Sequence, residues 1–275
     1  MKNYKLGVIG HGYVGESQSF AFSPSFDVRV YDKDSSKSTH SLGKVLESDF
    51  IFVCVPTPMK KNGSQDLSYV ENFFESAKDG PIYIIKSTVI PGTTSFLNKK
   101  FKNLKIIFSP EFLTERTAKL DILTQTRIIL GGDKKSTSRV REIYNIRFKN
   151  KTIIETDSIT AEYIKYMNNT FFASKVSLMN EFYRFANHLG VDWETALYGF
   201  VSDQRIGDSH LNVPGPDGKL GFGGTCFPKD INAFISFAKK NNVNMNILEA
   251  AWKTNLEVRP ERDWENLKGR AVSDD

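Results

Sequence analysis

The sequence predicts an α/β protein in which a parallel sheet is followed by a helical domain. Three observations support this fold class. Short apolar runs alternate with helical patterns through the first half of the chain. The run Asp49–Val55 is apolar nearly throughout, as in a strand buried on both faces. From Thr156 to Leu189 there is no Pro or Gly, which favours one long helix.

The first half is predicted to form the sheet. Its strands are expected at the apolar runs 5–9, 28–31, 49–55, 81–85, 104–108 and 127–130. Helices are expected near 68–78, 92–101 and 135–148. Strands that alternate with helices pair in parallel through right-handed crossovers, so this half is predicted to be a parallel sheet of the Rossmann type.

The second half is predicted to be helical. Apolar residues recur there at steps of three, four and seven: Ile164, Met167, Phe171, Leu178, Phe182, Phe185 and Leu189. The helix is expected to end at Gly190. More helices are expected near 192–200, 228–241 and 246–257. We therefore divide the chain into residues 1–155 (the sheet domain), 156–258 (the helical domain) and 259–275 (a polar tail).

The composition excludes several classes of protein. Two cysteines among 275 residues cannot form a disulfide framework or a zinc ligand set, so no metal is expected. No window approaches the roughly 18 unbroken apolar residues of a membrane span, and the start lacks a signal-peptide pattern. We therefore expect a cytoplasmic protein that does not bind membranes.

The net charge of +5 leaves two interpretations open. A nucleic-acid binder has such an excess of Lys and Arg, but the lysine pairs here are scattered and no basic stripe carries interleaved aromatics. A solvated basic surface is the favoured interpretation, with no nucleic-acid partner. Positive charge also suits a phosphorylated small molecule.

A glycine motif predicts a dinucleotide site. Gly10-His-Gly12-Tyr-Val-Gly15 follows the first strand and begins a helix. Gly10 permits the tight turn, Gly12 lets the backbone approach a pyrophosphate, and Gly15 lets the helix pack close to the strand. Asp32 ends the second strand, where its carboxylate can bind the adenosine ribose and would repel the 2′-phosphate of NADP. NAD is the predicted cofactor.

A second glycine-rich segment, Gly221-Phe-Gly-Gly-Thr-Cys-Phe-Pro-Lys-Asp230, delivers Cys226 to the start of a predicted helix. Backbone N–H groups, the helix dipole and Lys229 would favour a reactive thiolate there. A lone cysteine can instead be a small buried hydrophobe. We apply that interpretation to Cys54, which lies in a predicted core strand.

These motifs, taken together with four further blocks, resemble the UDP-glucose/GDP-mannose 6-dehydrogenase family. The further blocks are Val55-Pro-Thr-Pro58, Ser87-Thr-Val89, Ser109-Pro-Glu-Phe-Leu-Thr-Glu115 and Asp203-Gln-Arg-Ile-Gly207. The spacing of Lys165 and Asn169 also fits, and the match spans nearly the whole chain. By residue type alone, an exposed pair on a helix is the favoured interpretation of Lys165 and Asn169.

The resemblance implies two successive oxidations of the C6 alcohol of a nucleotide sugar by NAD, through a thiohemiacetal and a thioester on Cys226. UDP-glucose is the first choice of substrate, and such enzymes supply precursors of polysaccharides. GDP-mannose or a UDP-N-acetylhexosamine is the alternative within the class. A non-catalytic NAD-binding protein, or one partner of a split enzyme, is the alternative outside it.

The resemblance also implies residue roles. The catalytic set is Cys226, Lys165, Asn169, Glu111, Asp230 and Thr88. The cofactor set is Gly10, Gly12, Tyr13, Val14, Gly15, Asp32, Lys33, Val55, Pro56, Thr57, Ser87, Thr88, Glu115 and Lys229. The substrate set is Glu111, Phe112, Leu113, Lys165, Asn169, Arg205, Phe222 and Gly223. Lys165 and Asn169 would stabilise an oxyanion, while Glu111, Thr88 and Asp230 would place water.

Some features of the comparison stay open at this point. Glu111 ranks above Glu115 as the functional carboxylate because it follows a predicted strand end. Arg205 resembles an arginine that reaches a neighbouring subunit's site in a homodimer, although it could be a plain surface residue. Two departures are expected to matter. Arg116 replaces the usual glycine, and the family's third, nucleotide-binding domain lies outside these 275 residues.

Overall fold

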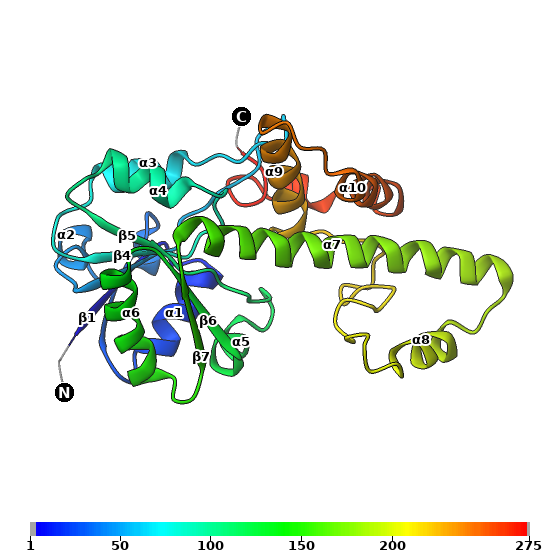
Figure 1. The fold of residues 1–275 in the computed structure, drawn as a ribbon, viewed down its shortest axis with the longest axis horizontal. Coiled ribbons are helices and arrows are strands. Elements are labelled where there is room, and N and C mark those ends of the chain that lie inside the picture. Colours follow the sequence, from blue (N-terminus) through cyan, green and yellow to red (C-terminus); the bar gives the residue numbers. More distant parts are fainter. Residues whose placement is uncertain (1–3, 274–275) are drawn as a thin grey trace. The chain divides into compact units, whose positions relative to one another are not determined.

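The computed structural model describes residues 4–273, and two compact units form within it. The first unit contains the residues up to Thr57 together with Asp66–Lys165. The second contains Pro58–Gln65 and the chain from Tyr166 onward. The division falls inside the long helix α7 (Ser158–Leu189), so one continuous helix contributes its first turns to one unit and the remainder to the other (Figure 1).

The first unit is built on a seven-stranded sheet in the order β2-β1-β3-β4-β5-β6-β7. The strands are β1 Lys5–Ile9, β2 Asp27–Tyr31, β3 Phe50–Val53, β4 Ile82–Ile85, β5 Lys105–Phe108, β6 Arg127–Gly131 and β7 Thr152–Thr156. The six predicted strands are confirmed, and β7 is an addition. The first five strands pair in parallel, and so do β6 and β7. The predicted parallel sheet has one exception, since β5 and β6 are antiparallel and meet only at Phe108 and Gly131.

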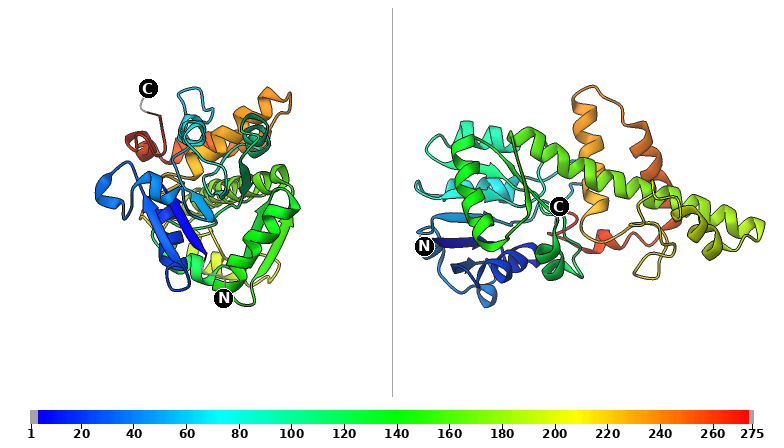
Figure 2. Two further views of the ribbon diagram at one scale, coloured as in Figure 1. Left: turned by 90° about the vertical axis from the view of Figure 1, so that its left-hand side faces the viewer. Right: turned by 60° about the horizontal axis from the view of Figure 1, so that its bottom comes forward.

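Helices cover both faces of this sheet, as Figures 1 and 2 show. They are α1 Tyr13–Phe22, α2 Leu42–Val45, α3 Ser68–Glu75, α4 Thr93–Lys100, α5 Ala118–Thr124 and α6 Lys134–Arg147, with a 3-10 turn at Ser35–Lys37. Alternate strand residues enter opposite cores. Phe50 and Phe52 pack with α1, α5 and α6, whereas Ile51 and Val53 pack with α2, α3 and α4. Burial on both faces explains why β3 is apolar at every position.

The strand order places a topological switch at β1. The chain leaves β1 to form β2 on one side and later β3 on the other. In open parallel sheets, ligands bind outside the carboxyl ends of the strands at such a point. The loops after β1, β2, β3, β4 and β5 therefore meet at the edge of the sheet where the predicted cofactor residues occur.

The second unit contains most of α7 together with α8 Trp193–Val201, α9 Phe227–Lys240 and α10 Asn246–Val258. All four helices were predicted. Ala173 of α7 packs with Ile231 and Ile235 of α9 and with Ala251 of α10. A second apolar cluster joins Met179 of α7 to the loop before α9.

The segment after α10, predicted as a polar tail, is packed instead. Arg259 is only 3% exposed and Trp264, in a short 3-10 helix at Asp263–Asn266, only 1%. The Trp264 ring lies 5.3 Å from that of Trp252 in α10. Ala271 accepts a hydrogen bond from the backbone of Met59. The segment looks like a tail in sequence because its buried residues are few: one tryptophan, one alanine and one ion-paired arginine.

One face of α7 is apolar and exposed. Its large side chains are between 45% and 63% exposed and follow one another at helical spacing: Tyr163, Met167, Phe171, Leu178, Phe182, Phe185 and Leu189. No helix among the described residues has both the length and the apolar character of a membrane span.

A buried carboxyl group connects the start of α7 to α4. Glu162 is fully buried, and its carboxylate accepts hydrogen bonds from the backbone of Gly92 at 2.6 Å and Thr94 at 2.8 Å. Gly92 is the N-cap residue of α4 and Thr94 lies in its first turn, so Glu162 caps that helix from a distant part of the chain. Burial nevertheless raises the pKa of Glu162 to about 7, against the opposing effect of these hydrogen bonds.

We expect this group to make the first unit less stable as the pH rises. A raised folded-state pKa means that folding favours the proton, and the benefit is lost between the unfolded pKa of about 4.5 and the folded pKa of about 7. In Glu162→Gln, the fall in unfolding free energy between pH 5 and pH 8 should be smaller by up to about 3 kcal/mol. Denaturant unfolding at both pH values measures this.

The matched control is Glu194→Gln, since Glu194 is exposed on α8. It should leave the pH dependence unchanged. If the unfolding free energy of Glu162→Gln fell between pH 5 and pH 8 by as much as that of the unchanged protein, the assignment would be wrong.

Candidate active site

The glycine loop between β1 and α1 has the form that the motif predicts. Gly10 has a positive φ of 84°, and a Cβ there would lie 2.7 Å from the carbonyl oxygen of Cys54. A Cβ on Gly15 would lie 1.9 Å from the carbonyl oxygen of Gly10, so α1 packs directly on the loop. At Gly12 a Cβ would meet nothing within 4 Å, and its φ of −74° suits any residue. The fold itself therefore requires Gly10 and Gly15 but not Gly12.

Asp32 follows β2 and holds the glycine loop in place. Its Oδ2 accepts a hydrogen bond from the backbone N–H of His11 at 2.6 Å, and its Oδ1 accepts one from Asp34 at 2.8 Å. The neighbouring Lys33 is exposed, with its ammonium 5.6 Å from the ring centre of Tyr69. Sequence spacing placed Asp32 beside the loop, and the structure adds that its carboxylate bonds to the loop's own backbone.

The loops after β3 and β4 are tied to each other. Ser87 Oγ donates to the carbonyl of Val55 at 2.6 Å, and Thr57 Oγ1 donates to the carbonyl of Thr88 at 2.9 Å. Thr57, Ser87 and Thr88 are buried, whereas Pro56 is exposed. Hydrogen bonds therefore link these predicted cofactor residues to one another at the carboxyl edge of the sheet. Tyr13 and Val14, in the first turn of α1, are half-buried.

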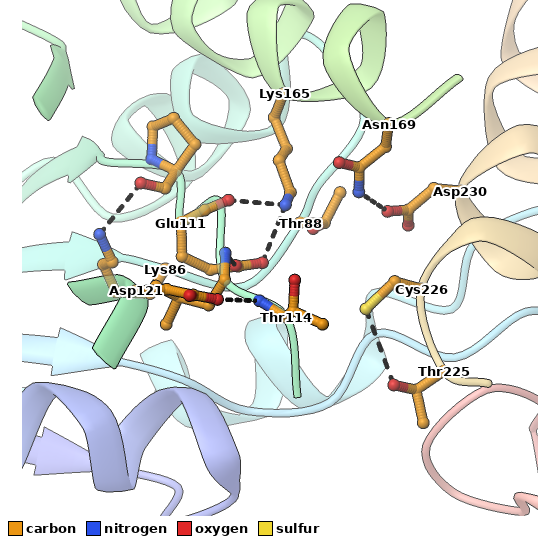
Figure 3. A network of polar contacts seen from close by, with 12 residues as sticks. Lys86, Thr88, Glu111, Thr114, Asp121, Lys165, Asn169, Thr225, Cys226 and Asp230 are labelled. Atoms are coloured by element: carbon orange, nitrogen blue, oxygen red, sulfur yellow. Dashed lines mark hydrogen bonds and ion pairs between the residues drawn. The ribbon is translucent and has the colours of Figure 1, made fainter. Parts of the chain in front are cut away.

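A buried ion pair joins α7 to the loop after β5. Lys165 Nζ donates to Glu111 Oε1 at 2.9 Å and to the Glu111 carbonyl at 2.6 Å, and both side chains are about 5% exposed (Figure 3). The second carboxylate oxygen of Glu111 accepts the N–H of Leu113 at 2.7 Å. Removing one partner would leave an uncompensated buried charge, so the two residues depend on each other.

Lys86 adds a second cation that sequence reasoning missed. Its buried ammonium follows β4 and donates to the Pro110 carbonyl at 3.1 Å. Burial alone would raise the pKa of Glu111, but Lys165, the Leu113 N–H and Lys86 outweigh it and hold that pKa below its usual value. The available signal was a lysine directly after an apolar strand, at the sheet edge where sites gather.

The loop after Glu111 presents predicted substrate residues. The Phe112 ring lies 5.4 Å from the Lys165 ammonium and 4.3 Å from the Arg127 guanidinium. Glu115 and Arg116 are exposed. The two carboxylates ranked in the sequence therefore differ in exposure: Glu111 is buried beside the Lys165 ammonium, whereas Glu115 is exposed.

In the second unit, Cys226 is the N-cap residue of α9. Pro228 occupies the first turn, where its missing N–H removes no helical bond. The Sγ atom lies 3.7 Å from Thr225 Oγ1 (Figure 3), and the cysteine is half-buried. A thiolate at this position would lie at the positive dipole end of α9.

A polar cluster follows in the first turn of α9. Asn169 Nδ2 donates to Asp230 Oδ2 at 2.6 Å, and Lys229 Nζ donates to Asp230 Oδ1 at 2.5 Å. All three residues are buried. Asn169 lies one helical turn after Lys165, so α7 presents an ammonium and a carboxamide on one face. Both groups can donate hydrogen bonds to an oxygen that gains negative charge.

The glycine loop before Cys226 is held by side chains from other segments. Phe222 is buried, and its backbone exchanges two hydrogen bonds with the Asn255 carboxamide, at 2.7 and 3.0 Å. A Cβ on Gly223 would lie 2.3 Å from Asp263 Oδ1. By contrast, Arg205 is 88% exposed and pairs with Asp203, two residues before it in the chain.

Cys54 differs sharply from Cys226. It follows β3 and packs against the apolar cluster that the sheet forms with α1, α5 and α6. Burial raises the pKa of the Cys54 thiol to about 12, which Lys86 only partly opposes. Such a thiol stays protonated at neutral pH and acts as a small hydrophobe. Among residues 4–273, no group of three or more His, Cys, Asp or Glu side chains forms a potential metal site.

These features define a dinucleotide-binding α/β protein whose helical unit carries a cysteine at a helix N-terminus. The chain belongs to the UDP-glucose/GDP-mannose dehydrogenase family. The model of that family's NAD binding domain matches residues 36–147, and the model of its central domain matches residues 159–257. NAD is therefore the cofactor that this fold is built to hold.

Individual relatives agree. The chain is 36% identical to UDP-glucose 6-dehydrogenase of Rickettsia conorii, over 82% of this chain and 54% of the relative. A UDP-glucose dehydrogenase structure from Pyrobaculum islandicum superposes with a TM-score of 0.84 at 29% identity, covering 96% of this chain and 70% of that one. A UDP-D-ManNAc dehydrogenase structure from Pyrococcus horikoshii gives 0.79 at 25%, covering 92% and 68%. The chain spans about half the length of the curated relatives it matches.

Gly12 offers a direct test of the cofactor site. In Gly12→Ala the new methyl group would occupy the space that a pyrophosphate needs, so NAD affinity should fall by on the order of 100-fold. Because the methyl meets no protein atom, the cost in unfolding free energy should not exceed about 1 kcal/mol. Calorimetric titration with NAD and thermal unfolding measure the two effects.

The matched control is Gly43→Ala in α2, where a Cβ also meets nothing within 4 Å. It should leave NAD affinity unchanged and slightly stabilise the helix. If Gly12→Ala bound NAD as tightly as the control, the glycine loop would not be the pyrophosphate site.

Proposed function

We propose that this protein oxidises the C6 alcohol of a nucleotide sugar to the uronic acid with NAD, with UDP-glucose as the first choice of sugar. One observation carries the proposal. Helix α7 presents Lys165 and Asn169 one turn apart, both buried and both bonded to a carboxylate, in a chain that also holds Cys226 at a helix N-terminus. Exposed residues at the same spacing would have supported only a solvated helix face.

The first step makes an aldehyde from the C6 alcohol. As the alcohol loses its proton, negative charge develops on the C6 oxygen. The Lys165 ammonium and the Asn169 carboxamide then act as hydrogen-bond donors to that oxygen. Their buried partners, Glu111 and Asp230, fix the two donors in place before substrate binds. When bound, NAD accepts the hydride that leaves the carbon.

The second step needs a nucleophile, because a planar aldehyde has no hydride to release readily. The Cys226 thiolate adds to C6 and forms a thiohemiacetal. Loss of a hydride from this carbon, which a second NAD would accept when bound, leaves a thioester. Water then attacks the thioester carbonyl, the C–S bond breaks, and the thiol and the uronic acid are released. Glu111, Thr88 and Asp230 are the groups we assign to the placement of that water.

The residues of the first unit fit NAD. The open position at Gly12 admits the pyrophosphate, and the α1 N-terminus supplies N–H groups for it. Asp32 would accept hydrogen bonds from the adenosine ribose and would disfavour the additional phosphate of NADP. The rest of the cofactor would lie against the linked loops after β3 and β4, which carry Val55, Thr57, Ser87 and Thr88.

The mechanism predicts that each uronate requires the formation of two NADH, with little free aldehyde. Cys226→Ser should lower uronate production at least about 100-fold, because a serine hydroxyl forms an anion far less readily at pH 7. NADH absorbance combined with chromatographic detection of the uronate measures the ratio. UDP-glucose, GDP-mannose and a UDP-N-acetylhexosamine are compared as substrates.

Cys54→Ser is the control, since its thiol is protonated at neutral pH and should affect stability rather than turnover. Near-normal uronate production by Cys226→Ser would overturn the mechanism. Tight NAD binding with no NADH from any of the three sugars would favour the alternative, a non-catalytic NAD-binding protein or one partner of a split enzyme.

We also propose that the exposed face of α7 is covered by a second copy of this chain. The helix is about 48 Å long at 1.5 Å per residue, and its apolar face continues to Leu189. A patch of this extent is costly to leave in water. A single straight face can pair with itself about a two-fold axis, which is the commonest symmetry of soluble oligomers.

A charge placed in the middle of this face should separate the copies. Leu178→Glu should convert a dimer into a monomer in sedimentation velocity at micromolar concentration, because burying the carboxylate against apolar side chains is unfavourable. Ile247→Glu is the control, since Ile247 is 78% exposed but lies on α10. A monomeric mass for the unchanged protein would contradict the proposal.

A further inference from the structure

A buried arginine outside the predicted site organises the loop that leads to Cys226. Arg259 follows α10 and is 3% exposed. Its Nε donates to Asp263 Oδ1 at 2.6 Å, and its Nη2 donates to Asp217 Oδ2 at 2.6 Å. Its Nη1 donates to the Leu220 carbonyl at 3.3 Å. One guanidinium thus bridges two carboxylates and one backbone carbonyl, which its fork of donors allows.

The same three-residue cluster of Arg259, Asp217 and Asp263 reaches the cysteine loop directly. The second oxygen of Asp263 accepts the backbone N–H of Gly224 at 2.9 Å. A Cβ on Gly223 would lie 2.6 Å from Arg259 Nε, so the guanidinium packs on the glycine backbone itself. Gly224 has a φ of +71° and stands two residues before Cys226.

Both carboxyl groups of the cluster favour their charged form. Burial alone would raise the pKa of Asp263 and of Asp217, but the hydrogen bonds and charge of Arg259 outweigh it and lower both. The other anchors of the loop are neutral carboxamides: Asn180 accepts the Gly221 N–H, and Asn255 binds Phe222. Arg259 therefore supplies the only cation among the anchors that the structure describes for residues 221–224.

We propose that Arg259 is a positioning residue for Cys226. By holding Asp217 and Asp263 it fixes the backbone of Gly223 and Gly224, and this backbone sets Cys226 at the N-cap of α9. The N–H groups and dipole of α9 stabilise a thiolate only while the cysteine keeps that position. The catalytic consequence rests on the proposed function, whereas the effect on the thiol does not.

The test measures alkylation of Cys226 by iodoacetamide against pH, in a Cys54→Ser background that leaves one thiol. In Arg259→Gln the midpoint of the alkylation profile should move to higher pH, and the rate at pH 7 should fall about tenfold. Arg259→Lys should show most of this loss, because a single ammonium cannot bridge both carboxylates as the guanidinium fork does. Circular dichroism checks that each variant is folded.

Arg262→Gln is the matched control, since Arg262 is half exposed and pairs only with Glu265, at 3.5 Å, among the salt bridges described for it. Its alkylation profile should equal that of the background protein. Asp217→Asn serves if Arg259→Gln fails to fold. Asp217 is 48% exposed, so this change should be tolerated and should shift the profile in the same direction by less.

A folded Arg259→Gln with an unshifted alkylation profile would overturn the proposal, as would an unshifted Asp217→Asn where Arg259→Gln is unfolded. The two proposals fail separately. If the unchanged protein makes no uronate but Arg259→Gln still shifts the thiol, the function is wrong and the positioning role stands. If uronate forms, kcat in Arg259→Gln should fall with little change in the KM for NAD.

Discussion

Lys165 carries a positive charge into the protein interior, and the structure around the candidate site follows from the need to compensate it. Glu111 supplies the opposite charge, and the loop after β5 must run where its carbonyl and carboxylate both reach the ammonium. One turn along α7, the neutral carboxamide of Asn169 is also buried and donates a hydrogen bond to Asp230. The absence of Pro and Gly from α7 lets the helix continue without a break through both positions.

The two glycine loops show how packing can separate structural glycines from functional ones. Gly10 and Gly15 are required by the carbonyl oxygens that lie against them, and Gly221 and Gly223 by Asn255, Asp263 and Arg259. Gly12 has no such neighbour and no special φ. At this turn, which lies at the carboxyl edge of the sheet, a glycine that the fold does not need leaves room for a ligand to approach the backbone. The motif alone could not make this distinction, because all three glycines of Gly10-x-Gly12-x-x-Gly15 look equivalent in sequence.

Local patterns predicted most of the architecture. Apolar periodicity gave six of the seven strands and the long helix, since both signals come from residues near one another in the chain. It missed β7, whose residues are at most half-buried and whose pattern is weak. It also mistook the segment after Arg259 for a tail. That segment is ordered by pairs such as Arg259 with Asp217, which lie far apart in the sequence, and no periodicity records such a partnership.

The candidate site divides in the same way. Cys226, Asp32 and the glycine loop could be found because each lies in a short motif beside a strand end or helix start. Glu162 could not, since its importance comes from burial against a distant partner. Lys86 offered only its place after an apolar strand, and its contact with Pro110 is not visible in the sequence. The resemblance to a family supplied Lys165 and Asn169, which residue type alone would have assigned to a solvated surface.

The two cysteines show why environment rather than residue type decides the chemistry. Cys54 lies against an apolar cluster that raises the pKa of its thiol to about 12, so it contributes volume and no nucleophile. Cys226 follows a glycine-rich loop and stands directly before the first turn of α9. Glycines alone would leave that turn free to move, and a mobile thiol would lose the helix N–H groups that favour its anion. The proposed role of Arg259 resolves this conflict. Its buried guanidinium holds Asp217 and Asp263, and Asp263 in turn holds the backbone N–H of Gly224.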